Sequence, residues 1–206
     1  MKKPTIIGLY SPVPGCGKDT MARHLAKYGY ANVKMAGPLK AMAAVLYRSL
    51  GFEESEMPLL LDGPTRHLID IFPAETYKVP SESMGMVEVT RPAVTARDIL
   101  LTLGTEWGRQ HVNFNLWTTC ATRTIERSLR AGVPVVVTDV RFPNEAKLIR
   151  EMGGELWRIE RPQAPQPTKQ HPSDYGLEDE RFDLRLRNAG TVIALEAAID
   201  AHLNRG

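Results

Sequence analysis

The segment from Pro12 to Thr20 has the residues of a phosphate-binding loop. Its letters, PVPGCGKDT, follow an apolar run at 5–10 and precede a helical pattern at 21–28. In a loop between a strand and a helix, successive backbone N–H groups can surround the phosphates of a nucleotide, and the positive end of the helix dipole adds to the attraction. The side chain of Lys18 would then reach the terminal phosphates.

Two positions depart from the usual loop pattern G-x-x-x-x-G-K-[ST]. Pro12 replaces the first glycine, and Asp19 stands where Ser or Thr usually holds magnesium. Pro12 and Pro14 have no N–H to donate. The expected phosphate-binding residues are therefore Gly15, Cys16, Gly17, Lys18, Asp19 and Thr20. The alternative is a simple Gly/Pro turn, which would not explain a Gly-Lys pair at the start of a helix.

A second polar group follows the apolar run VPVVVT at 133–138, and its members are Asp139, Arg141, Asn144 and Glu145. A carboxylate after a buried strand is the Walker B arrangement, in which it holds magnesium directly or through water. By itself such an aspartate also caps helices or starts turns. Arg141 could bind a phosphoryl oxygen and neutralise charge in the transition state, and a surface salt bridge is the alternative.

The run GTEWGR at 104–109 adds an aromatic ring and a guanidinium near the end of a helical pattern. Trp107 could stack on a base, and Arg109 could bind the phosphate of an acceptor, although periodicity alone favours a core position for Trp107. Three further cations are candidate substrate contacts or solvated charges: Lys40, Arg66 and Arg97.

Alternating strand and helix patterns must position these groups. Beyond the loop, helices are expected at 39–50, 95–112, 116–131, 142–152 and 191–203, and strands at 31–35, 133–138, 155–159 and 182–188. This alternation predicts a three-layer α/β fold, with a mostly parallel sheet and helices on both faces. Ligands bind such sheets outside the carboxyl ends of the strands, where the loop and Asp139 would lie.

Two segments interrupt the alternation. Residues 51–94 contain acids, Gly63-Pro64 and two short alternating runs, which predict an insertion with a short helix and a β-hairpin. Residues 161–175 contain four prolines and predict either a loop that closes over the site or a passive linker. We therefore expect a single domain over 1–206 with a small acceptor-binding insertion.

Composition excludes several classes of protein. A chain of 206 residues with 43% hydrophobic content can form one substantial core. The net charge of +2, without a basic tract, favours a small anionic partner over a nucleic-acid polymer. Two distant cysteines, Cys16 and Cys120, indicate neither a zinc cluster nor a disulfide framework. The apolar run at 6–10 is too short for a signal peptide or a membrane span, so a cytoplasmic location is expected.

The sequence resembles the deoxynucleoside monophosphate kinases of bacteriophages. The loop ends in GKDT at 17–20, as in that family, and the most specific match is TDVRFPNEA at 138–146. Further matches are PLK at 38–40, LTLGTEWGR at 101–109, HPSD at 171–174 and DLRLRN at 183–188. Asp19 is thus a family feature, whereas Pro12 is a departure from it.

The resemblance implies a P-loop kinase fold and transfer of the γ-phosphoryl group of ATP to a deoxynucleoside monophosphate. It adds Val13 and Asn188 to the ATP site, and gives Mg²⁺ to Asp19, Thr20 or Asp139. The implied catalytic residues are Lys18, Arg109, Asp139 and Arg141. The implied substrate contacts are Lys40, Arg66, Arg97, Trp107, Arg109, Arg141, Asn144 and Glu145.

Other readings stay open at this point. One is a P-loop kinase with another acceptor, such as dephospho-coenzyme A or a modified nucleotide. Another is a module that binds ATP without transferring phosphate, although the several cations on the acceptor side count against it. The resemblance also implies that Lys169 and His171 lie on a loop that closes over the site, and that the protein acts in the host cytoplasm if it is viral. Related enzymes are often dimers, so a homodimer is one alternative and the oligomeric state stays open.

Overall fold

The structure, a computed structural model, describes residues 3–13, 15–81, 83, 85–162 and 176–204. The chain divides into two compact units. The first unit contains residues 1–36 and 117–206, and the second contains residues 37–116. Each unit has hydrophobic clusters of its own.

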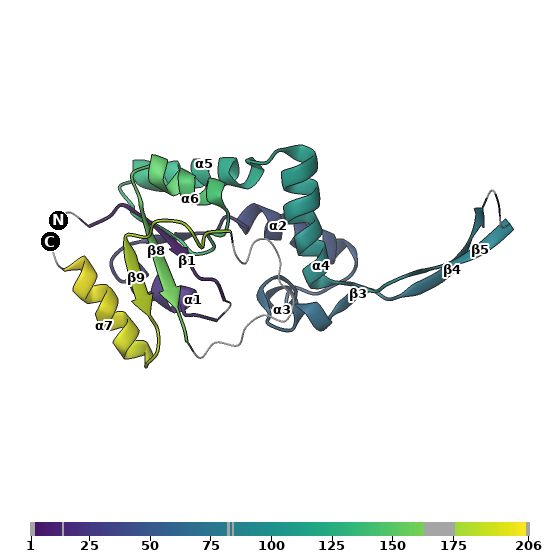
Figure 1. Cartoon of the computed structure of the whole chain (residues 1–206), viewed down its shortest axis with the longest axis horizontal. Coiled ribbons are helices and arrows are strands. Elements are labelled where there is room, and N and C mark those ends of the chain that lie inside the picture. The colour runs from purple at the N-terminus through teal and green to yellow at the C-terminus, as the bar shows by residue number, and fades with distance from the viewer. Residues whose placement is uncertain (1–2, 14, 82, 84, 163–175, 205–206) are drawn as a thin grey trace. The chain divides into compact units, whose positions relative to one another are not determined.

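The first unit is built on a five-stranded parallel sheet with the strand order β2-β7-β1-β8-β9. Figure 1 labels β1, β8 and β9 of this sheet. These strands are β1 (Ile6–Tyr10), β2 (Ala31–Val33), β7 (Val135–Val137), β8 (Glu155–Glu160) and β9 (Leu184–Arg187). Every residue of β1 and β7 is buried, as expected for central strands covered on both faces. The predicted parallel sheet is confirmed.

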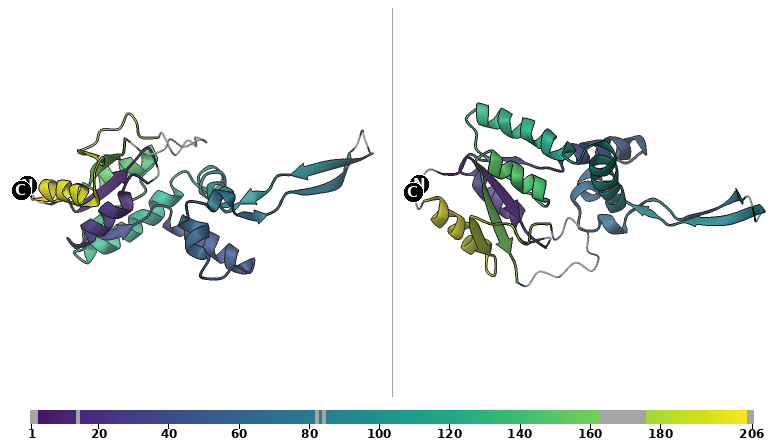
Figure 2. Two further views of the ribbon diagram at one scale, coloured as in Figure 1. Left: turned by 90° about the horizontal axis from the view of Figure 1, so that it is seen from below. Right: turned by 45° about the horizontal axis from the view of Figure 1, so that its top comes forward.

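Helices cover both faces of this sheet (Figure 2). Residues of β1 alternate between the two faces, because successive side chains of a strand point to opposite sides. Ile7 and Leu9 pack with α1 (Lys18–Ala26) and α7 (Val192–Leu203). Ile6 and Tyr10 pack with α5 (Leu116–Arg130) and α6 (Pro143–Glu151). The predicted three-layer α/β class is confirmed.

The strand order places a switch point at β1. Strands β7 and β2 lie on one side of β1, and strands β8 and β9 lie on the other. In open α/β sheets, ligands bind at such a point, outside the carboxyl ends of the strands. Gly8 of β1 pairs with Val137 of β7, so Asp139 leaves β7 at the level where the predicted phosphate-binding loop leaves β1.

The second unit is larger than the predicted insertion at 51–94. It contains α2 (Gly37–Ser49), α3 (Met57–Asp62), η1 (Arg66–Leu68) and α4 (Ala96–Leu101), together with a short β3–β6 pair at Asp70–Phe72 and Val94–Thr95. The reason is packing: buried residues of α2, α3 and α4 share one core, and the Tyr47 hydroxyl donates to the Ala96 carbonyl at 3.1 Å.

The predicted hairpin in the second unit is confirmed, whereas the predicted helix at 95–112 is more complex. The hairpin is a ribbon of β4 (Glu75–Ser81) and β5 (Gly85–Arg91) (Figure 1). After α4, the chain continues as an eleven-residue π-helix, η2 (Thr102–Val112). π-Helices are rare and occur frequently at functional sites. Among the described residues, no helix is both long and apolar enough to cross a bilayer.

Candidate active site

The loop between β1 and α1 has the backbone form of an anion-binding site. Gly15 has φ 72° and Gly17 has φ 107°, in the left-handed region that glycine enters without strain. Left-handed residues alternating with right-handed ones turn successive N–H groups toward one concavity. Gly17 is also the N-cap of α1, so this concavity lies at the positive end of a helix dipole.

Two side chains that follow β8 and β9 donate to carbonyl groups of this loop. Asn188 Nδ2 donates to the Cys16 carbonyl at 2.8 Å, and Arg161 Nη1 donates to the Gly15 carbonyl at 3.2 Å. Asn188 follows β9, and its own N–H donates to the Glu160 carbonyl at 2.7 Å. The structure places the Asn188 amide against the loop between β1 and α1, and its predicted contact with ATP stays a prediction.

Lys18 stands in the first turn of α1 within a group of charged side chains. Burial lowers the pKa of Lys18 to about 8, and the positive charge of Arg141 adds to this effect. Cys16, Asp19 and Asp139 act in the opposite direction. The structure thus brings together four residues that the sequence predicted for phosphate and metal binding: Lys18, Asp19, Asp139 and Arg141.

The Asp139 carboxylate links the ends of two neighbouring strands. Its Oδ1 accepts the N–H of Met35 at 2.7 Å, and its Oδ2 accepts the N–H of Ala36 at 2.9 Å. Both oxygens are therefore engaged with the segment that follows β2. A carboxylate oxygen has a second lone pair, so a water ligand of a metal can still be bound.

Glu145 has a structural role at the start of α6, and its predicted contact with substrate stays a prediction. Its side chain is buried, with the residue only 2% exposed, and its Oε2 accepts the N–H groups of Arg141 at 2.7 Å and Phe142 at 3.1 Å. It therefore caps the start of α6 and fixes the backbone turn that carries Arg141. The Arg141 side chain itself is exposed, and Asn144 is half-buried in the first turn of α6.

The residues Asp19 and Thr20 follow Lys18 in the first turn of α1. The Thr20 hydroxyl accepts a hydrogen bond from Arg23 at 3.3 Å. Within the described part of the chain, no group of three or more His, Cys, Asp or Glu residues could hold a metal by itself. Mg²⁺ usually binds one or two carboxylates together with substrate phosphates, so these oxygens fit a metal that arrives with a nucleotide.

Two predicted acceptor residues lie on η2 in the second unit. Arg109 is 8% exposed, and its Nη1 donates to the Phe114 carbonyl at 3.5 Å. Trp107 is 39% exposed, so the core position that periodicity favoured for it is wrong. The reason is the change to π-helical geometry, which alters the face on which each residue of this segment lies.

The other three predicted cations also belong to the second unit. Lys40, in the first turn of α2, forms an ion pair with Asp62. Arg66 Nη1 donates to the Gly63 carbonyl at 3.0 Å, and Arg97 lies in the first turn of α4. Their predicted contacts with substrate stay predictions. Lys169 and His171 lie outside the described residues.

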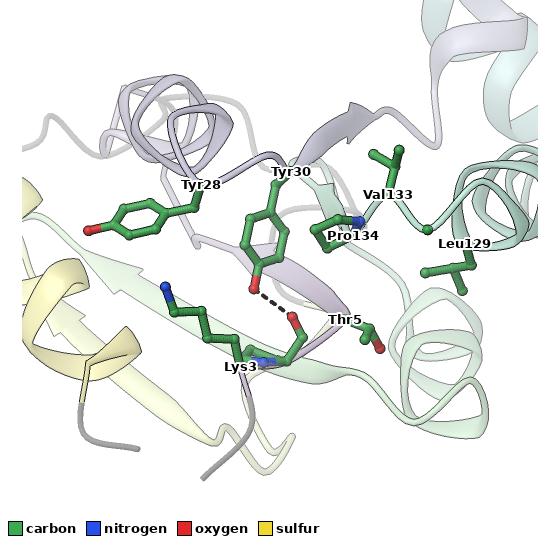
Figure 3. A pocket seen from close by; sticks show the side chains of 9 residues that line it. Lys3, Thr5, Tyr28, Tyr30, Leu129, Val133 and Pro134 are labelled. Atoms are coloured by element: carbon green, nitrogen blue, oxygen red, sulfur yellow. Dashed lines mark hydrogen bonds between the residues drawn. The ribbon is translucent and has the colours of Figure 1, made fainter.

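A cavity of about 430 Å³ lies in the first unit at the amino ends of β1, β2 and β7 (Figure 3). Thr5, Tyr30 and Pro134 line it, and they directly precede the regions of β1, β2 and β7. The Tyr30 hydroxyl donates to the Pro4 carbonyl at 2.5 Å, and burial raises the pKa of Tyr30 to about 12. The cavity is therefore separate from the predicted phosphate-binding loop, which lies at the carboxyl ends of the strands.

A family model described as deoxynucleotide monophosphate kinase matches residues 74–199. The chain belongs to this family. The match includes Asp139, Arg141 and Asn188, whereas the loop at 12–20 lies outside it and is supported by its own geometry.

Two relatives of the chain carry matching descriptions. The "Deoxynucleoside-5'-monophosphate kinase" of Escherichia phage T5 is 42% identical over 60 residues, which are 28% of this chain and 22% of that protein. The "Putative deoxynucleotide monophosphate kinase" of Acanthamoeba polyphaga mimivirus is 42% identical over 59 residues, which are 28% of this chain and 30% of that protein. The matched segments thus span less than a third of either relative.

A solved structure of a dephospho-CoA kinase from Campylobacter jejuni is also similar to the chain. It has 9% sequence identity and a TM-score of 0.40, with 98% of each chain covered. A similarity this low favours no particular acceptor.

Several residues that shape the site were not predicted from the sequence. A glutamate three residues after the start of a helix is a known capping signal, so the role of Glu145 could have been found. The amides of Met35 and Ala36, and the contact of Arg161 with the loop, have no local signal because their partners are distant in sequence.

Proposed function

We propose that the chain is an ATP-dependent kinase that transfers the γ-phosphoryl group of ATP to the 5′-phosphate of a deoxynucleoside monophosphate, giving the diphosphate and ADP. The observation that carries this proposal is the group formed by Lys18, Asp139 and Arg141 beside the loop at the carboxyl edge of the sheet. Family membership supplies the acceptor class.

The loop and Lys18 are the donor half of this proposed site. The N–H groups of residues 15–20 and the Lys18 ammonium would bind the ATP phosphates, with Val13 at the loop entrance. Thr20, Asp19 and Asp139 would hold Mg²⁺ directly or through water. Bound there, Mg²⁺ would neutralise charge on the phosphate oxygens.

Arg141 is the proposed cation for the transferring group. Its exposed guanidinium can make two parallel hydrogen bonds to phosphoryl oxygens, and the turn that carries it is fixed by Glu145. The acceptor phosphate is already an anion and needs no general base, so positioning and charge neutralisation carry the reaction. Arg109 and Trp107 are proposed acceptor contacts on the family resemblance.

The test is ADP formation with each deoxynucleoside monophosphate, each ribonucleoside monophosphate and dephospho-coenzyme A in turn. We expect turnover with at least one deoxynucleoside monophosphate, and loss of that turnover in Lys18→Ala without loss of the fold. Turnover with dephospho-coenzyme A alone would contradict the proposed acceptor. ATP binding without any product would instead indicate a non-catalytic module.

Two further properties accompany this function as proposals. A kinase of this kind would act in the cytoplasm, of the host cell if the protein is viral. It would form a homodimer, which light scattering at micromolar concentration would detect as twice the 23.0 kDa mass of one chain.

A further inference from the structure

We propose that Asn188 and Arg161 are positioning residues that hold the phosphate-binding loop in its binding form. Through the loop, Asn188 would strengthen binding of the phosphates of the nucleotide and not of its base. This inference rests on the proposed binding of ATP by the loop. It assigns to Asn188 a role different from a contact with adenine.

The carbonyl groups of Gly15 and Cys16 in the loop accept hydrogen bonds from side chains. When N–H groups of successive residues turn toward a bound anion, the carbonyl groups of the same peptides turn away from it. Buried carbonyl groups need donors. Cys16 is 1% exposed, and the donor for its carbonyl is Asn188 Nδ2 at 2.8 Å. Gly15 is exposed, and its carbonyl accepts a hydrogen bond from Arg161 Nη1 at 3.2 Å.

The side chain of Asn188 packs closely against Gly17 of the loop. A Cβ placed on Gly17 would lie 2.8 Å from Asn188 Nδ2 and 3.2 Å from Leu195 Cδ2. The Asn188 amide and the Leu195 side chain of α7 therefore occupy the space beside the left-handed residue of the loop. This contact restricts the turn at Gly17, which sets the direction of the N–H groups that follow.

Hydrogen bonds hold both ends of β9, the strand that precedes Asn188. Strand β9 is anchored at its start, where Asp183 Oδ2 accepts the Leu156 N–H at 2.8 Å. At its end, the Asn188 N–H donates to the Glu160 carbonyl at 2.7 Å. Because β9 is fixed in the sheet, the Asn188 amide has a fixed position from which it holds the loop.

This loop has fewer N–H groups than usual, so the orientation of those that remain matters more. Pro12 and Pro14 supply no N–H groups, so binding depends on the N–H groups from Gly15 onward. A preorganised site binds more tightly than one that must order its loop on binding. Loss of the support should therefore weaken the binding of any polyphosphate, with or without a base.

The experiment compares two probes, Mg-ATP and Mg-tripolyphosphate, by calorimetry on the full chain. Asn188→Leu keeps a similar shape but removes the donor. We expect it to weaken binding of both probes by a similar factor, about tenfold, as for a lost hydrogen bond of a buried group. Weaker binding of ATP alone would overturn the proposal in favour of an adenine contact, and unchanged binding of both probes would overturn it outright.

Controls separate this positioning role from a general loss of structure. Asn204→Leu changes an exposed asparagine at the end of α7 and should leave both affinities unchanged. If Asn188→Leu does not fold, Asn188→Ala replaces it. The KM for the acceptor should stay within about twofold in the variant, because only the donor half is affected. A proportional rise in that KM would overturn the proposal.

Arg161 is tested in the same way. Arg161→Ala should weaken both probes, whereas Arg130→Ala, which removes a 73% exposed side chain of α5, should weaken neither. Equal weakening of probe binding by the two arginine variants would indicate general charge attraction. Unchanged binding in Arg161→Ala would also overturn the role of Arg161. If the unmodified chain binds neither probe, the proposed function fails, and this outcome is distinct from every result above.

Discussion

The buried carboxylate of Glu145 accepts the backbone N–H of Arg141 at 2.7 Å. The same oxygen accepts the N–H of Phe142, so one acid fixes the turn between β7 and α6. The exposed residue Arg141 thus extends from a backbone turn that two hydrogen bonds hold. A residue that is predicted to touch substrate is positioned by one that is 2% exposed.

Replacing Glu145 should reduce both stability and turnover. Glu145→Ala leaves two N–H groups without their acceptor, which costs about 1–3 kcal/mol in the free energy of unfolding. Glu145→Gln keeps an acceptor oxygen and should cost less. Urea unfolding measures the difference, and Glu126→Ala on the exposed side of α5 is the control, with an effect within about 0.5 kcal/mol. Equal losses for the Ala and Gln variants would contradict the capping role.

Asp139→Asn should destabilise the chain in the absence of Mg²⁺. The amide nitrogen of Asn cannot accept a hydrogen bond, so either the Met35 or the Ala36 N–H loses its partner. We expect a loss of about 1–3 kcal/mol in the free energy of unfolding, as for a donor that is left without its acceptor. Urea unfolding with a chelator present isolates this effect from metal binding. A variant as stable as the original chain would show that these two bonds contribute little.

The binding of ATP should weaken as the pH rises through about 8. The pKa of Lys18 is lowered to about 8, chiefly by burial, so the free enzyme loses this positive charge above that pH. The value of kcat/KM for ATP reports groups of the free enzyme and should fall on the alkaline side. The kcat should persist to higher pH, because bound phosphates favour the protonated amine.

Lys18→Arg provides the control for this pH dependence. The guanidinium keeps its charge at all pH values in the experiment, so the residual affinity of the variant for ATP should be flat across the same range. A decline with the same midpoint in the variant would assign the alkaline limb to another group.

Gly17→Ala should prevent phosphate binding, whereas Gly29→Ala should not. Both glycines have positive φ, 107° and 85°, so each alanine brings strain of about 1–2 kcal/mol. Only at Gly17 does the new Cβ meet a neighbour, Asn188 Nδ2 at 2.8 Å; at Gly29 nothing lies within 4 Å. Calorimetric titration with Mg-ATP distinguishes the two variants. Equal ATP affinities would show that the loop tolerates the added group.

Asp200→Asn should destabilise the contact between α1 and α7. Hydrogen bonds from Tyr28 at 2.6 Å and His24 at 2.5 Å hold the pKa of Asp200 below its usual range. A lowered pKa means that this stabilisation is present at neutral pH and is lost as the pH falls through the folded-state pKa. Thermal unfolding should show a gap between the two proteins at pH 7 that narrows below pH of about 4. Glu151→Gln, on the exposed side of α6, should show no such gap.

Local patterns in the sequence determined the elements and the loop. The apolar run of β1, the Gly-Lys pair at 17–18 and the helical period of α1 are signals within a few residues of one another, so the sequence alone is enough to interpret them. The alternation of strands and helices likewise determined a parallel sheet covered on both faces. The resemblance rested on short contiguous blocks such as 138–146.

Only the tertiary structure decided which polar groups meet. Asp139 binds amides 104 and 103 residues away, and Asn188 binds a carbonyl 172 residues away. These pairs depend on the order β2-β7-β1-β8-β9, which places β7 beside β2 and links β9 to the loop through β8. Strand order is set by the packing of the whole core and has no periodic signal in the chain. The sequence therefore predicted a phosphate-binding loop, and the fold decided that Asn188 supports it.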